Sequence, residues 1–220
     1  YTLSLHDALP IYNDAGALQI DSDNKTTLFS DIRNIDGLTD NGYYKIDNPF
    51  GGSYPFGFLK PADTPVPGYL YWFRLNAGAF AMPGAFSFQN GSGQIIRTTR
   101  NLGVESGYLD VMNGNGDLIW SAKSASRVPR VRGFIDLPAN SPVDSQIVSF
   151  SPGFNPWILM NMVPGNISDD GESTGYSGLL IKWTGSEIQV KYTSKYQKNF
   201  SQSFGGRGGL KIPYAYFQGY

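Results

Sequence analysis

The 220-residue chain contains no cysteine and a single histidine, His6. Without cysteine there are no disulfides, and with one histidine there is no zinc site built from these side chains. No apolar run approaches the roughly 18 residues that a membrane-spanning helix needs, so we expect no membrane insertion. Charged residues make up only 16% of the chain, against about 25% in an ordinary soluble domain. These absences exclude several classes of site but do not themselves indicate a function.

The N-terminal segment Tyr1–Ile11 has the sequence YTLSLHDALPI and resembles, over its whole length, the translation of a common short-read sequencing adapter. A secretory signal peptide would instead carry basic residues before an unbroken apolar run. Here there is no Lys or Arg, and His6 and Asp7 interrupt the run. We therefore expect residues 1–11 to be an adapter-derived scar outside the fold, at the truncated start of an environmentally sequenced gene.

Setting this segment aside removes the only histidine, which excludes Ser-His-Asp and Cys-His catalysis and any histidine pH switch within the chain. It also removes Asp7, which leaves 17 acidic residues against 17 basic ones. A neutral chain without basic runs lacks the electrostatic signature of nucleic-acid binding. We expect no nucleic-acid partner.

The residues that are abundant favour β-structure. The chain has 27 Gly, 14 Pro and 15% aromatic residues, which are typical of turns and strands. Short apolar segments alternate with turn residues, and no window shows the helical spacing of apolar positions. The sequence predicts an all-β fold, an antiparallel β-sandwich built from hairpins, with long ordered loops and no substantial helix. We expect one large domain over residues 12–220; the alternative is two small β domains, 12–100 and 101–220.

Several strands are predicted individually. Gly68–Leu75 is continuously apolar, which indicates a buried strand. Tyr176–Trp183 and Glu187–Tyr192 flank a short polar turn and predict a hairpin. Lys211–Phe217 predicts a final strand, and the glycine-rich segment Ser203–Gly209 before it is expected to be flexible.

The segment Asn48–Pro67 contains five prolines, three glycines and four aromatic residues. Proline removes a ladder donor and fixes φ, so we expect an ordered loop rather than a continuous strand. An interdomain linker is the alternative, although linkers are seldom this aromatic. We identify as candidate contacts with a partner or a host surface the four aromatic residues of this loop, Phe50, Tyr54, Phe56 and Phe58.

The segment Asn166–Gly175 is the most polar stretch and is expected to be an exposed loop. Its acidic residues Asp169, Asp170 and Glu172 are further candidate contacts. Paired carboxylates could also hydrolyse a glycoside, but one of them would need burial to raise its pKa. We expect the loop to be solvated, and enzyme motifs such as GxSxG are absent. The sequence therefore predicts a protein that is not an enzyme and has no cofactor.

Two other patterns are weaker. Arg127, Arg130 and Arg132 could bind phosphate or an acidic glycan, but strand-edge or subunit contacts are favoured. The segment 21–24 resembles the start of a calcium loop, yet positions 6 and 12 are Thr26 and Ile32, which do not complete one. No metal site is expected.

An internal repeat organises the chain. Gly16–Ser30 recurs, without a gap, at Gly107–Ser121. Each copy has an alternating apolar strand, a turn of Asn, Asp or Gly, and a second strand, which predicts a β-hairpin. The matched pairs are Gly16/Gly107, Leu18/Leu109, Ile20/Val111, Asn24/Asn115, Leu28/Ile119, Phe29/Trp120 and Ser30/Ser121. The apolar positions recur and the acidic ones do not, so the unit is interpreted as a packing module.

The pattern G-x-L-x-[IV], a turn, then [LI]-[FW]-S resembles a strand unit of tailed-bacteriophage virion proteins, among them minor tail, tail-tip and fibre-associated proteins. The resemblance covers the two copies of the repeat. It implies a structural virion protein, a phage tail or tail-fibre component that acts in assembly and surface contact. The implied partners are further copies in a homo-oligomer, other virion proteins and a host-surface glycan. The alternative is an extracellular carbohydrate-binding β-sandwich module.

Overall fold

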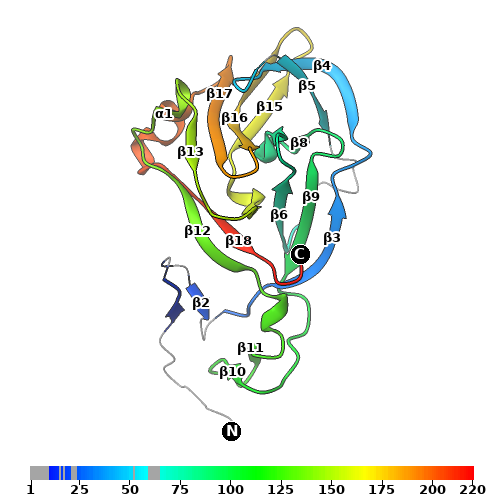
Figure 1. Ribbon diagram of the computed structural model, residues 1–220, viewed down its shortest axis with the longest axis vertical. Helices are drawn as coiled ribbons and strands as arrows, with labels where there is room; N and C mark the ends of the chain where they lie inside the picture. Colours follow the sequence, from blue (N-terminus) through cyan, green and yellow to red (C-terminus); the bar gives the residue numbers. More distant parts are fainter. Residues whose placement is uncertain (1–9, 15, 17, 21–23, 52, 59–64) are drawn as a thin grey trace.

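The computed structural model describes residues 10–220 except 15, 17, 21–23, 52 and 59–64. Nearly all regular structure in this part is β-strand, and every strand pairing is antiparallel (Figure 1). The predicted all-β sandwich fold is confirmed. None of the helices in the described part is long and apolar enough to cross a membrane.

The largest sheet has six strands and combines segments from both halves of the chain. Its order is β12 (Arg130–Leu137), β18 (Leu210–Tyr216), β14 (Trp157–Leu159), β6 (Tyr69–Leu75), β9 (Gly93–Thr99) and β3 (Leu28–Asn34). The predicted strands at Gly68–Leu75 and Lys211–Phe217 correspond to β6 and β18. Because β6, β9 and β3 come from the first half and the other three from the second, the halves share one sheet.

A second sheet faces the first. Its order is β13 (Val148–Phe150), β17 (Ile188–Lys195), β16 (Thr174–Trp183) and β15 (Gly165–Asp169), with β7 (Phe80–Ala81) also paired to β16. The predicted hairpin is β16–β17, in register from Tyr176 opposite Lys195 to Trp183 opposite Ile188. A three-stranded sheet of β4 (Thr39–Asp47), β5 (Ser53–Phe58) and β8 (Ser87–Phe88) lies beside it.

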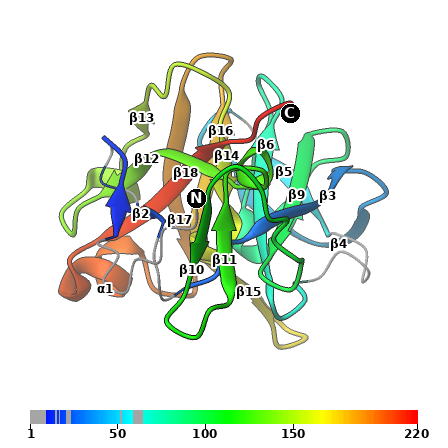
Figure 2. The same ribbon diagram turned by 90° about the horizontal axis from the view of Figure 1, so that it is seen from below.

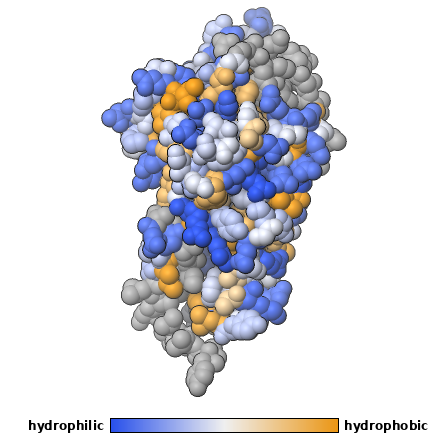
Figure 3. All heavy atoms as spheres, in the orientation of Figure 1, coloured by the Kyte–Doolittle hydropathy of each residue, from blue (hydrophilic) through white to orange (hydrophobic). Residues whose placement is uncertain are grey.

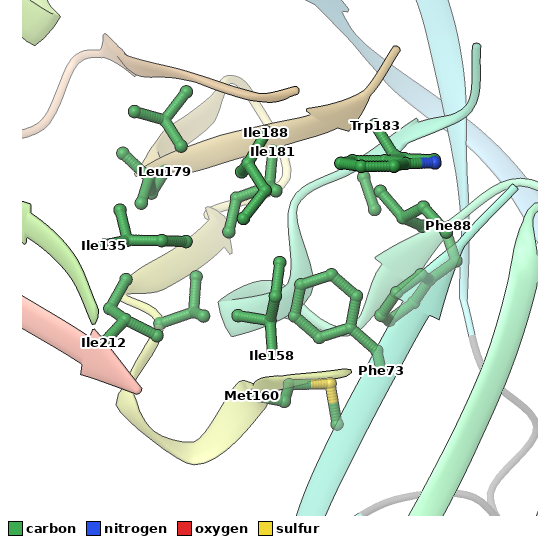
Figure 4. Close-up of a cluster of buried hydrophobic side chains, with 14 of the residues drawn as sticks. Phe73, Phe88, Ile135, Ile158, Met160, Leu179, Ile181, Trp183, Ile188 and Ile212 are labelled. Atoms are coloured by element: carbon green, nitrogen blue, oxygen red, sulfur yellow. The ribbon is translucent and has the colours of Figure 1, made fainter. Parts of the chain in front are cut away.

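The main hydrophobic core lies between the two large sheets, where side chains from β6, β12, β14 and β18 meet those of β16 and β17 (Figure 4). Phe73, Ile158 and Ile181 are among its fully or almost fully buried members. A separate cluster covers the opposite face of the six-stranded sheet, where Trp72 and Trp157 pack edge-on against Phe217 of the C-terminal segment. The six-stranded sheet therefore buries both of its faces.

Two small sheets form what we call the basal unit, defined as β1 (Ile11–Tyr12), β2 (Leu18–Ile20), β10 (Asp110–Met112) and β11 (Leu118–Ser121). It lies at one end of the molecule, as the views from the side and from below both show (Figures 1 and 2). The Asn13 side chain donates to Val131 O, and Thr26 N donates to Ile119 O at 3.1 Å, which attach this unit to the rest of the chain.

The two copies of the repeat fold differently. The second copy forms the predicted hairpin, with β10 paired to β11. For the first copy the hairpin prediction is wrong, because β2 pairs with β1 whereas the return strand is part of β3 and pairs with β9. The longer β9 pairs with β3 from Leu28 to Asn34, with one irregularity between Phe29 and Asp31. Ile11, the last residue of the segment that we expected outside the fold, pairs with Ile20.

The predicted loop over Asn48–Pro67 is also wrong in part, because Ser53–Phe58 is strand β5. This strand pairs with β4 along its length and with β8 only at Gly57 and Phe58. Pro55 therefore lies where β5 has a strand neighbour on one side only, and such a position tolerates the missing N–H.

One α-helix, α1 (Phe200–Phe204), is present in the described part, followed by a 3-10 turn at Gly205–Arg207. The segment Ser203–Gly209, which we expected to be flexible, thus contains the end of α1 and a 3-10 turn. The helix is too short to produce a periodic apolar pattern, but it carries a capping box in which Asn199 and Gln202 bond each other's backbone N–H groups. Further 3-10 turns lie at Pro83–Ala85, Ala125–Arg127, Pro142–Asp144 and Met160–Met162.

The turn at Pro83–Ala85 lies against β15 and β16 through glycines. A Cβ on Gly84 would lie 2.3 Å from Val163 O and 2.4 Å from the Gly165 nitrogen. We predict that Gly84→Ala lowers the free energy of unfolding by about 1–3 kcal/mol, because backbone atoms cannot move aside cheaply. Urea denaturation measures the change, and Gly114→Ala, with open space around its Cβ, is the matched control. Equal stabilities for the two variants would contradict the close approach.

Candidate functional site

The residues predicted as contacts are distributed over two hairpins. Phe50 lies in the β4–β5 turn and is half-buried, with its ring centroid 5.8 Å from that of Phe80 and Lys182 Nζ 5.3 Å away. It therefore packs on the outer face of β16. The side chains of Tyr54, Phe56, Phe58 and Asp169 lie outside the described part of the structure.

The predicted polar loop is shorter than expected, because β15 and β16 extend into it and leave a turn at residues 170–173. In this turn Asp170 Oδ1 accepts the backbone N–H groups of Glu172, at 3.0 Å, and Ser173, at 2.7 Å. These bonds hold the pKa of Asp170 below its ordinary value, the Ser173 N–H contributing most. A catalytic acid needs the opposite shift. Asp170 and Glu172 are exposed, as expected for a solvated turn.

Exposed apolar residues lie on the basal unit and on the two residues before β10, which we count with the unit from here on. Tyr108 is 95% exposed, and Leu109 beside it is also exposed. The other exposed apolar residues of the unit are Ile11, Tyr12 and Leu18. Apolar residues are visible at this end of the molecular surface (Figure 3). These side chains are not part of the buried core clusters and are accessible to another molecule.

The loop that presents Tyr108 is held in a strained conformation. Tyr108 has φ +67°, which L residues rarely adopt, and Gly107 before it has φ +153°. The Asp110 carboxylate accepts the Gly107 N–H at 2.9 Å and the Ser106 hydroxyl. The same bonds, led by that from Gly107, hold the pKa of Asp110 below its ordinary value. Strained residues held by their surroundings are common at functional positions.

A hollow of about 200 Å³ lies beside the basal unit, lined by Trp120, Arg130 and Arg132 among others. Arg130 donates to the Gln218 side chain at 2.8 Å, and Arg127 donates to Phe29 O at 3.1 Å. Two of the three arginines thus bond within the chain and connect its segments.

The larger hollow, about 370 Å³, lies on the outer side of the second sheet, and we call it the β17 pocket. It is lined by Asn48 and Pro49 of the β4–β5 turn, Asp144 of a 3-10 turn, Lys191, Tyr192, Thr193 and Ser194 of β17, and Asn199 before α1. β13 pairs only with Ile188–Val190, so in the described chain the β17 edge beyond Val190 has no strand neighbour on that side.

Asp144 and Lys191 carry the charges of the β17 pocket. The Asp144 carboxylate accepts the backbone N–H groups of Phe200, at 2.8 Å, and Ser201, at 3.0 Å. Lys191 Nζ donates to Asp144 O at 3.1 Å. Burial lowers the pKa of the Lys191 ammonium, and the nearby Asp144 charge partly opposes that shift.

No sequence motif indicated the β17 pocket, because its lining residues come from four separated segments. The one local signal was the Asn199-x-x-Gln202 capping pattern, which indicates a helix start but not a site. Within the described residues, no group of three or more His, Cys, Asp or Glu side chains could hold a metal ion.

Residues 7–219 match a protein family described as a domain of unknown function, DUF8377. The match spans nearly the whole sequence, so the chain belongs to this family. Comparison with curated proteins and with solved structures finds no match.

The hydrogen bonds to Asp110 make the Tyr108 loop sensitive to acid. Because the pKa of Asp110 is lowered in the folded state, its stabilising effect is present at neutral pH and is lost as the pH falls through that lowered pKa. We predict that the Gly107 amide chemical shift titrates with a midpoint below 3.8, the ordinary value for aspartate. NMR titration measures this. Asp110→Asn should remove the transition and Asp117→Asn should retain it; a midpoint above 3.8 would contradict the assignment.

Proposed function

We propose that this member of the DUF8377 family is a structural protein that works by assembly and surface contact, as a tail or tail-fibre component of a tailed-phage virion. The observation that carries the proposal is the exposed apolar surface of the basal unit, centred on Tyr108 and Leu109. Tyr108 and Leu109 are neighbours in the chain, and exposed apolar groups of this kind on a soluble protein can mark a protein–protein contact.

The architecture of the basal unit supports assembly. Among the described residues each of its two sheets has two strands, and a two-stranded sheet is marginally stable by itself in water. Edge strands carry backbone N–H and C=O groups that can pair with another chain, although Ile119 O of β11 already accepts from Thr26 N. Contact with a second copy of the chain would bury Tyr108 and Leu109 and add strands to these small sheets. Most soluble oligomers are symmetric assemblies of identical chains.

The placement in a phage tail rests on the resemblance carried by the repeat. The resembling positions of the second copy form an ordered hairpin, in which Val111 and Ile119 are buried while Leu109 is exposed. One hairpin of this kind can thus pack on its own chain and still offer apolar residues to a neighbour. In an assembly of many copies, individually weak contacts combine into strong attachment through avidity.

The alternative function is an extracellular carbohydrate-binding module. The β17 pocket favours it, because its polar lining and open strand edge offer hydrogen-bonding groups to a hydroxylated ligand. The two functions differ in oligomeric state, since a binding module can act as a monomer whereas the tail component needs neighbours.

Light scattering coupled to gel filtration tests the assembly. We expect the protein to be a homo-oligomer at about 100 µM, well above the Kd of a stable complex. The double variant Tyr108→Ser/Leu109→Ser should dissociate to monomer because it loses the exposed apolar contact. Tyr196→Ser is the matched control, since Tyr196 is also strongly exposed, at 77%, and also has a positive φ. A monomeric parent protein would contradict the proposed assembly.

The phage assignment needs a separate measurement. Antibodies raised against the purified chain should label the tails of phage particles that encode it, as seen by immunogold electron microscopy. Labelling of the free secreted protein alone, with none on particles, would favour the carbohydrate-binding alternative.

A further inference from the structure

The β17 pocket and the basal unit lie at opposite ends of the molecule. In Figure 1 β17 and the β4–β5 hairpin are at the upper end, and β10 and β11 are at the lower end. A ligand in the pocket therefore leaves the basal unit free to contact another molecule. The pocket volume of about 370 Å³ lies within the range of roughly 300–1,000 Å³ that is usual for small-molecule sites.

The pocket contains a cation that forms no ion pair within the described chain, although the Asp144 charge lies near enough to act on its pKa. Lys191 Nζ bonds a backbone carbonyl, and in the described chain no carboxylate oxygen lies within the 4.0 Å of an ion pair. An ammonium has three N–H donors, so two remain available here. Its partial burial removes water that would otherwise solvate it. A ligand that brings a negative charge would replace that lost solvation.

Asp144 is the one acid among the described lining residues, and its carboxylate is already bound by other donors. Both oxygens of the Asp144 carboxylate are bound by donors at the start of α1, namely Phe200 N, Ser201 N and the Ser201 hydroxyl. Lys191 is the one basic residue among the described lining residues of the pocket. Its ammonium can attract the anionic group of a ligand.

The remaining groups suit a hydroxylated ligand. Thr193 and Ser194 line the pocket, and neither side chain has a hydrogen-bond partner among the described residues. The Asn199 carbonyl oxygen is used in the helix cap, while its NH₂ group has no such partner. Hydroxyl groups both donate and accept, and an amide NH₂ donates, so together they can bond several sugar hydroxyls.

The loop between two lining residues, Ser194 and Asn199, carries Tyr196. Its side chain is 77% exposed, and its φ of +57° lies in the left-handed region. The Lys195 ammonium lies 5.3 Å from the centre of the Tyr196 ring, so a sugar ring could stack only on the opposite face of the tyrosine. The strained backbone at Tyr196 is consistent with a position held for contact.

We propose that the β17 pocket binds an acidic saccharide, with the sugar carboxylate opposite the Lys191 ammonium and the sugar hydroxyls on Thr193, Ser194 and Asn199. Within the proposed function this is the contact with a host-surface glycan. The pocket itself does not require assembly, because all of its lining residues belong to one chain.

Isothermal titration calorimetry with sialyllactose and with tri-galacturonic acid tests the proposal, and lactose is the neutral counterpart. At least one acidic probe should bind at millimolar or lower concentration, about tenfold more tightly than lactose. Raising the salt concentration should weaken binding. Absence of binding by both acidic probes, or equal binding of lactose, would overturn the proposal.

Variants locate the site. Lys191→Met should weaken binding of the acidic probe about tenfold or more, because it removes the ammonium and keeps the side-chain length. Thr193→Val should weaken binding of every sugar by a smaller factor, and it removes no hydrogen bond within the described chain. Lys211→Met, on the exposed β18 ion pair with Asp136, is the control and should bind as the parent does. Unchanged affinity in both pocket variants, with circular dichroism confirming their fold, would overturn the location.

The result of the sugar-binding experiments can be distinguished from the result of the assembly experiment. The Tyr108→Ser/Leu109→Ser variant should bind the acidic saccharide with unchanged affinity per chain, because its substitutions lie at the other end of the molecule. A monomeric parent that binds the acidic sugar would remove the proposed assembly and retain the pocket. An oligomeric parent that binds no acidic sugar would do the reverse.

Discussion

The fold depends on β16, which contributes side chains to two hydrophobic clusters, the main core and a second cluster on its opposite face. Leu179, Ile181 and Trp183 face the main core against the six-stranded sheet. Tyr176 and Leu180 face the other way, into a cluster closed by Ile46, Phe80 and Met82. A strand buried on both faces must satisfy its backbone entirely within the sheet, and β16 does so by pairing with β15, β17 and β7. Gly178 in the same strand lets the backbone of Gly165 approach closely.

This central arrangement explains which elements the sequence could predict. The buried strands β6 and β16 are long apolar runs, so their local pattern is enough. The first repeat copy and β5 depend on which partner a strand finds far along the chain. Two sequence segments that match as closely as Gly16–Ser30 and Gly107–Ser121 differ in fold because β9 is available to one of them. Local pattern does not encode that choice.

The two candidate sites also differ in how far the sequence could predict them. Tyr108 and Leu109 lie within the second copy of the repeat, which the sequence identifies as a structural unit. The contact residues predicted from the sequence, however, lie in other segments. The β17 pocket joins Asn48, Asp144, Lys191 and Asn199, which are brought together only by packing. Asp144 is the connecting residue, because its carboxylate caps α1 while its carbonyl oxygen accepts from Lys191. A single aspartate in the short turn Pro142–Asp144 carries no motif that would reveal this.

A strained backbone conformation occurs at an exposed tyrosine near each end of the molecule. Of the described non-glycine residues with positive φ, Tyr108 and Tyr196 are also the two most exposed large hydrophobic side chains, whereas Phe86 is half-buried beside Tyr71. Such conformations cost on the order of 1–3 kcal/mol each. For Phe86, packing in the core offsets that cost. For the two tyrosines no comparable burial does so, which is the basis for assigning both to contacts with other molecules, one with a neighbouring copy and one with a ligand.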